Sequence, residues 1–138
     1  MTRALALLLL ASPWPWAMAA DTDCGAGMDV RQRRVLSSPR HQIAFVVQPA
    51  PLVVGRHFAL DVVACPRAGA SPPVALRVDA DMPAHRHGMN YRPTVRALGD
   101  GRYRVDGLLL HMAGRWRLLF DLTADGRLER LTNEFELE

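Results

Sequence analysis

Apolar residues alternate with polar ones in several short stretches of the 138-residue chain, and Pro, Gly and Asp residues separate these stretches. Alternation of this kind is the pattern of a half-buried β-strand, because successive side chains point to opposite faces of a sheet. About seven short strands separated by turns predict an all-β fold, an immunoglobulin-like antiparallel β-sandwich. We expect these strands within residues 41–49, 57–66, 73–81, 94–110, 114–122 and 129–138, with a hairpin turn at Gly99-Asp100-Gly101.

The stretch GRWRLLFDL, residues 114–122, predicts which side chains form the core. One face of this strand carries Trp116, Leu118, Phe120 and Leu122, and the other carries Arg115, Arg117 and Asp121. We therefore predict that Trp116 is a core residue, since a large buried aromatic side chain dominates a small core. Before the first strand, residues 28–35 are expected to form one short helical turn that ends at Ser37-Ser38-Pro39.

The N-terminus has the features of a secretory signal peptide. Arg3 precedes an apolar run over residues 4–11, which Pro13, Pro15 and the small-residue end Ala17-Met18-Ala19-Ala20 follow. The run is too short to span a bilayer. We therefore expect cleavage near Ala19–Asp21 and a periplasmic product with no stable membrane span. The predicted organisation is a signal peptide at 1–20, an N-terminal segment at 21–40 and a β-sandwich domain at 41–138.

Two cysteines, Cys24 and Cys65, remain after this cleavage. An even number of cysteines in an exported protein indicates a disulfide, because the compartment is oxidising. The predicted bond would tie the N-terminal segment to the body of the domain. The alternative is two free thiols, with Cys65 simply buried as a small apolar side chain.

Composition argues against several classes of function. The 17 basic residues are all Arg, the acidic residues number 14, and the formal net charge is +3. The arginines alternate with core residues and form no basic stripe with interleaved aromatics, so we expect no nucleic-acid partner. The chain has no G-x-S-x-G motif, no phosphate loop and no cysteine expected to be a free nucleophile, so we predict no catalytic residues and no enzymatic activity.

One segment, MPAHRHGM at residues 82–89, does not fit the alternating pattern. Pro83 and Gly88 disfavour a strand, so we expect the preceding strand to end before Met82 and the segment to be a loop. In an extended loop His85, His87 and Met89 lie on one side, and Met82 reaches the same place if the chain bends at Pro83. Imidazole suits copper and zinc, and thioether sulfur suits Cu(I). A single loop histidine is usually solvated and a single methionine usually packs, but ordinary loops do not collect both residue types.

A second pair, His111 and Met112, precedes the strand at 114–122 in another loop. Loops at the same end of a sandwich can meet, so both residues are further candidate ligands. Neighbouring residues of an extended chain point in opposite directions, which argues against both binding one ion, and Met112 is equally well explained as a core side chain. We expect the other two strand-opening histidines, His41 and His57, to be surface residues.

These motifs resemble the YtkA-like and FixH-like families of small exported bacterial proteins. The stretch from Met82-Pro83 through Met89 is similar to a first family motif, and Gly101, Tyr103, Met112, Gly114 and Trp116 are similar to a second. The likeness covers roughly residues 41–124, and Ala113 stands where the families often have Pro. The resemblance implies an immunoglobulin-like fold and a role in periplasmic copper handling or cytochrome oxidase maturation.

We therefore expect an exported copper-binding protein that carries Cu(I) or assists assembly, and that exchanges the ion with a copper-donating or copper-accepting envelope protein. Its metal ligands are predicted to be His85, His87 and Met89, then Met82, then His111 and Met112. The alternative is an envelope interaction module that binds no metal and uses the Met/His loop as its docking edge.

Overall fold

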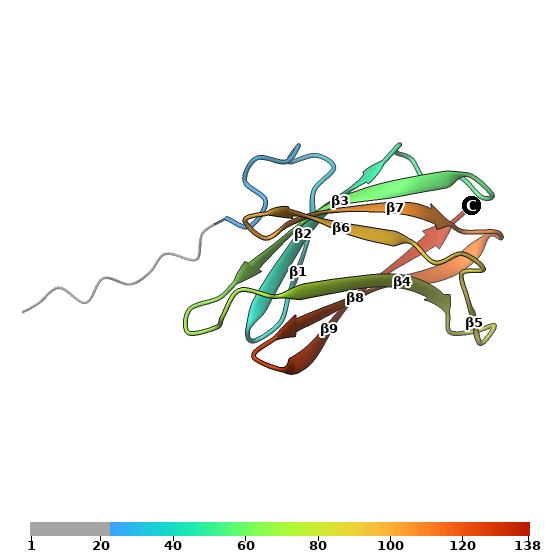
Figure 1. Ribbon diagram of the computed structural model, residues 1–138. Coiled ribbons are helices and arrows are strands. Elements are labelled where there is room, and N and C mark those ends of the chain that lie inside the picture. The colour runs from blue at the N-terminus through green and yellow to red at the C-terminus, as the bar shows by residue number, and fades with distance from the viewer. Residues whose placement is uncertain (1–22) are drawn as a thin grey trace, which may run out of the picture.

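A computed structural model describes residues 23–138, so the predicted signal peptide and its cleavage site lie outside the described residues. Two antiparallel sheets pack face to face as a sandwich, and the described part of the chain has no helix (Figure 1). The first sheet has the order β1-β2-β3-β7-β6, with bounds Arg34–Ser37, His41–Gln48, His57–Pro66, Arg102–Leu109 and Thr94–Gly99. The second has the order β5-β4-β8-β9, with bounds His87–Gly88, Ala75–Met82, Gly114–Ala124 and Arg127–Leu137. The predicted all-β sandwich is confirmed.

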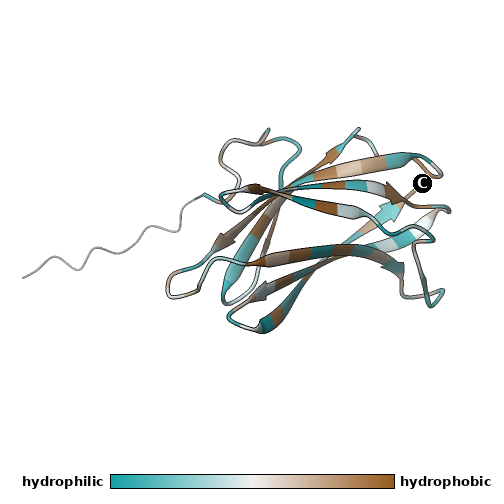
Figure 2. Cartoon of the chain, in the orientation of Figure 1, coloured by the Kyte–Doolittle hydropathy of each residue, from teal (hydrophilic) through white to brown (hydrophobic). Residues whose placement is uncertain are grey.

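The core lies between the two sheets, where the inward side chains of both meet. Trp116, Leu118, Phe120 and Leu122 of β8 are each at most 1% exposed, as their alternation predicts. Phe45 of β2 contacts Phe120 across the interface with ring centroids 5.0 Å apart. Bands of apolar and polar residues alternate along the strands (Figure 2). Burial of alternate apolar side chains therefore stabilises the fold.

The structure contains the hairpin turn predicted at residues 99–101, but the N-terminal segment is less helical than predicted. The hairpin joins β6 to β7 through Asp100 and Gly101, whose φ angles are +52° and +70°. Residues 28–35 do not form a helical turn throughout. One hydrogen-bonded turn closes at Asp29, whose carbonyl accepts from the amides of Gln32 and Arg33, and β1 then begins at Arg34. The turn is short because β1 pairs with β2 instead of continuing it.

The predicted disulfide is confirmed. Cys24 and Cys65 are bonded with their Cα atoms 5.9 Å apart, which ties the N-terminal segment to the end of β3. A disulfide is typical of an oxidising compartment outside the cytoplasm. Within residues 23–138 there is no helix long and apolar enough to cross a membrane.

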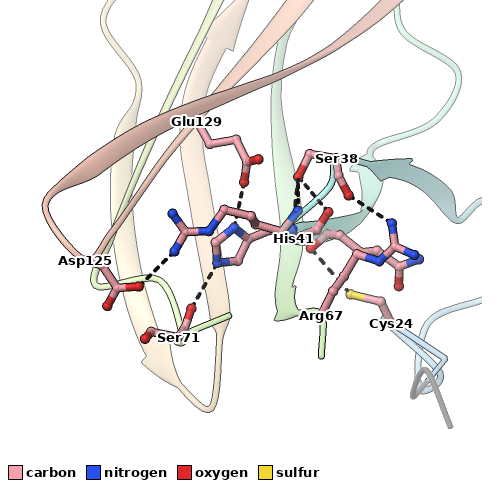
Figure 3. Close-up of polar contacts among 9 residues, drawn as sticks. Cys24, Ser38, His41, Arg67, Ser71, Asp125 and Glu129 are labelled. Atoms are coloured by element: carbon pink, nitrogen blue, oxygen red, sulfur yellow. Dashed lines mark hydrogen bonds and ion pairs between the residues drawn. The ribbon is translucent and has the colours of Figure 1, made fainter. Parts of the chain in front are cut away.

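His41 is not a surface residue, contrary to the sequence-based expectation, because it is 1% exposed. Its Nδ1 lies 2.6 Å from Glu129 Oε2, and its Nε2 lies 3.0 Å from the carbonyl oxygen of Ser71 (Figure 3). Both partners are hydrogen-bond acceptors, so each can accept from a ring nitrogen that carries a proton. The ring thereby joins β2 of one sheet to β9 of the other and to the loop before β4.

The pKa of Glu129 lies below its usual range. Burial is the largest single effect and raises this pKa, but hydrogen bonds from His41 and Ser38, with the charges of His41 and Arg40, lower it by more. The carboxylate is therefore held ionised beside a buried imidazole.

Candidate metal centre

The hairpin of β4 and β5 positions the Met/His segment at one end of the sandwich, the end that also holds the C-terminus (Figure 1). The expectation that the strand ends before Met82 is wrong, because β4 includes Met82 and pairs it with His87. Turn residues 83–86 follow. The amides of His85 and Arg86 both donate to the carbonyl of Met82 at 3.0 Å, and Arg86 has φ +56°.

The return strand lies close to β4, and Gly88 permits this approach. A Cβ atom at position 88 would lie 3.1 Å from the carbonyl oxygen of Ala80, a tight contact. The amide of Met89 donates to that same oxygen at 3.0 Å. Gly88 thus lets the chain close the hairpin and holds His87 and Met89 beside β4.

The structure brings three imidazoles together, and two of them lie against one indole. The ring of His87 lies 5.8 Å from that of His85 and 5.1 Å from that of His111, measured between centroids. His111 comes from the loop between β7 and β8, so loops distant in sequence meet here. Trp116 lies beneath, with its ring 5.8 Å from that of His87 and 5.5 Å from that of His111, edge to face in both cases.

Trp116 also fixes the loop that carries His111. Its Nε1–H donates to the carbonyl oxygen of Met112 at 2.9 Å. The side chain is fully buried. Sequence reasoning identified Trp116 as a core residue but missed its contact with the imidazoles. Its position only two residues after Gly114, at the start of β8, is the signal that could have indicated this contact.

Two ring nitrogens of the cluster have open bonding capacity. Among the described residues, His111 Nδ1 is the one buried side-chain nitrogen or oxygen atom that has no hydrogen-bond partner. Leaving such an atom unpaired costs free energy. The Nδ1 of His87 lies 3.3 Å from the carbonyl oxygen of Gly88. If the proton is on Nδ1, the lone pair of His87 Nε2 is free to bind a ligand.

The methionines of the two loops differ in burial. Met82 is 1% exposed and belongs to the core, next to Gly114 of β8, where an added Cβ would lie 2.8 Å from the Met82 Cε. Met89 and Met112 are partly buried and pack against the core. Two methionine sulfurs lie near His87. Thioethers therefore accompany the imidazoles at this end of the sandwich.

Carboxylates do not complete this cluster. Within residues 23–138, no three His, Cys, Asp or Glu side chains lie close enough together to hold a metal ion. Asp81, the neighbour of Met82, is bound instead by Arg117 in a two-pronged contact of 2.9 and 2.7 Å. This hydrogen-bonded pairing raises the pKa of Arg117. An ion held here by imidazoles would need methionine sulfur as a further ligand.

His57 is a surface residue, as expected from the sequence, and among the described residues its ring makes no contact with the three clustered histidines. It is exposed, and its ring contacts that of Tyr91 at 5.4 Å. His57 is therefore a matched control for experiments on the three clustered histidines.

The comparisons with known proteins address the fold. No family model and no curated protein matches the chain. A solved structure of a DUF4426 family protein from Pseudomonas aeruginosa PAO1 is similar, with a TM-score of 0.53 and 10% sequence identity over 79% of this chain and 97% of that chain. At this identity the likeness is one of fold alone.

Proposed function

We propose that this protein binds copper as Cu(I) at the end of the sandwich where His85, His87 and His111 meet. The observation that supports this proposal best is the pair of His87 and His111. Their rings lie 5.1 Å apart, and the Nδ1 of His111 is buried without a partner. A metal ion at this point would give that nitrogen the bond it lacks.

The chemistry of the neighbouring side chains favours a soft monovalent ion. Imidazole nitrogen and thioether sulfur both bind Cu(I). Carboxylate suits harder ions, and in the described part of the chain no carboxylate joins two of these histidines in a group that could hold a metal ion. We take His87 and His111 as the nitrogen ligands, with sulfur from Met89 or Met112. Met82 is the remaining sulfur candidate, and it would bind only from within the core.

Such a site would need no thiol. Both cysteines are joined in the disulfide, so they are not available as ligands. Neither methionine nor neutral histidine must lose a proton to bind a metal, so a Met/His site would keep its ligands in an oxidising compartment.

One side of the proposed site is open. His85 is exposed on the turn, whereas His87 is partly buried beneath it. An exposed outer ligand suits a protein that passes its ion to another. We therefore propose a carrier or assembly factor of the bacterial periplasm that exchanges copper with an envelope partner, in line with the resemblance to the YtkA-like and FixH-like families.

A competition titration against a Cu(I) chelator tests the proposal. Ascorbate serves as the reductant, so that the disulfide stays intact. We expect the wild type and the control His57→Ala to bind Cu(I) with equal affinity. The affinity of His87→Ala and of His111→Ala should be at least tenfold lower. Absence of Cu(I) binding by the wild type, or equal binding by all four proteins, would end the copper proposal.

A further inference from the structure

Strand β9 is an edge strand with one free side. It is the last strand of its sheet, and no strand of the described chain pairs with its outer side (Figure 1). It runs for 11 residues, from Arg127 to Leu137. A long edge exposes a row of unpaired backbone amides and carbonyls and so can accept another strand.

There is room beside the second half of this strand. β1 has only four residues and pairs with β2 no further than Phe45, so a groove remains between β9 and the segments 31–34 and 50–52. The groove has a volume of about 810 Å³, and Asn133, Phe135 and Leu137 of β9 line it. Its floor is apolar, with Phe45 and Leu118 at the base.

The residues of β9 are complementary to a second, antiparallel copy of the same strand. If a twofold axis passes through Asn133, a residue that precedes Asn133 in one copy lies opposite the residue that follows Asn133 by the same number of positions in the other copy. Arg130 then faces Glu136 on the exposed side, and Leu131 faces Phe135 on the inner side. Each of these pairs occurs twice. Opposite charges and apolar pairs directly across from each other stabilise antiparallel strands.

The two charged groups retain capacity for this contact. Arg130 binds Asp121 through its Nε and Nη2 atoms, and Nη1 makes no contact with Asp121. Glu136 is 59% exposed in its side chain and lies 3.8 Å from Arg115, at the long end of the range for an ion pair. Neither group is buried in a closed network.

We propose that two copies of this protein associate through their β9 strands, with the twofold axis at Asn133. The two four-stranded sheets then form one continuous sheet across the dimer. Because the two strands are antiparallel, the Met/His ends of the two subunits point in opposite directions. The dimer therefore leaves each candidate metal centre accessible and does not depend on copper.

Sedimentation and charge reversal test the interface. The purified protein is expected to sediment as a dimer that dissociates on dilution. Arg130→Glu and Glu136→Arg should each weaken association by at least tenfold, because each places like charges across from each other at two points. The double variant restores opposite charges and should recover most of the association. Arg127→Glu is the control with little expected effect, because Arg127 lies on the same strand but has no residue of the described chain opposite it in this register.

Cross-linking tests the register. Residues directly opposite in an antiparallel pair have Cα atoms about 4.5–5.5 Å apart, a distance that a disulfide can span. Asn133→Cys should therefore form a covalent dimer under mild oxidation. Thr132→Cys should not, because its two copies lie about 8 Å apart in this register. Mass mapping confirms that Cys24 and Cys65 stay paired. A wild type that remains monomeric at its highest soluble concentration, or cross-linking that is equal in both variants, would overturn the proposal.

Discussion

The imidazole of His87 on β5 lies 5.1 Å from that of His111 in the loop between β7 and β8, and both rings rest against Trp116. This contact joins two loops that are far apart in the sequence. It also places one unpaired nitrogen, the Nδ1 of His111, in a buried position. The unpaired nitrogen destabilises the metal-free fold, and a bound ligand would remove this destabilisation. A substitution that removes the nitrogen should therefore stabilise the metal-free protein and weaken metal binding.

Replacing His111 by Phe tests this opposition. The aromatic ring can keep its contact with Trp116, whereas the unpaired nitrogen is removed. We expect the free energy of unfolding of the metal-free protein to rise by roughly 1 kcal/mol, because a buried unsatisfied polar group is lost. Cu(I) affinity should fall in the same variant. Urea denaturation without metal, combined with the chelator competition, measures both. A large loss of stability would show that His111 is a packing residue and not a ligand.

Copper itself should stabilise the wild type. A ligand that binds only the folded state at a concentration of 100 Kd adds about 2.7 kcal/mol of stability. Thermal melts with and without Cu(I) should show this rise for the wild type and for His57→Ala. At the same Cu(I) concentration the rise should fall to about 1.4 kcal/mol or less for His87→Ala, whose affinity is expected to be at least tenfold weaker. An equal rise in His87→Ala would place the ion elsewhere.

Trp116 should affect both the fold and the site. Trp116→Ala should cost about 3–5 kcal/mol, because it removes a large, fully buried aromatic side chain. Trp116→Phe preserves much of the packing but loses the hydrogen bond to the carbonyl of Met112. We expect this milder variant to fold, with a smaller loss of stability and weaker Cu(I) binding. A variant Trp116→Ala that melts like the wild type would contradict the observed packing.

Acid should weaken the contact between His41 and Glu129. Because the pKa of Glu129 is lower in the folded state than its ordinary value of 4.5, its contribution is fully present above that value. It is lost as the pH falls below 4.5 and through the folded value. Denaturation at pH 7 and at pH 3 should therefore show a larger loss for the wild type than for Glu129→Gln, which lacks the titrating group. The same loss in both would show that Glu129 does not contribute to the acid sensitivity.

Breaking the disulfide should destabilise the domain through its unfolded state. The bond closes a sequence separation of 41 residues, for which the chain-entropy model gives about 4 kcal/mol. Replacing both cysteines by Ser should lower the free energy of unfolding by about this amount. Urea unfolding of the double variant measures it. The single variants are not suitable controls, because each leaves a free thiol.

The sequence by itself determined the sandwich, the hairpin at Asp100 and the buried face of β8. A period of two is set by the backbone geometry of a strand, so it can be read without knowing what the strand packs against. The disulfide was predictable because the chain has only two cysteines. The importance of the segment 82–89 was also evident, since its residue types do not suit a packed strand or an ordinary loop.

The tertiary structure alone decided where the histidines and methionines lie. Residues 41 and 129 are 88 positions apart, and no local sequence pattern shows that this histidine will be buried against a partly exposed carboxylate. Met82 entered the core because β4 continues as far as Met82, and the alternation that buries Leu76, Val78 and Ala80 then turns Met82 inward as well. The meeting of His111 with His87 depends on which strands are neighbours in the sheets. Alternation tells which way a side chain points, but strand order decides what it meets.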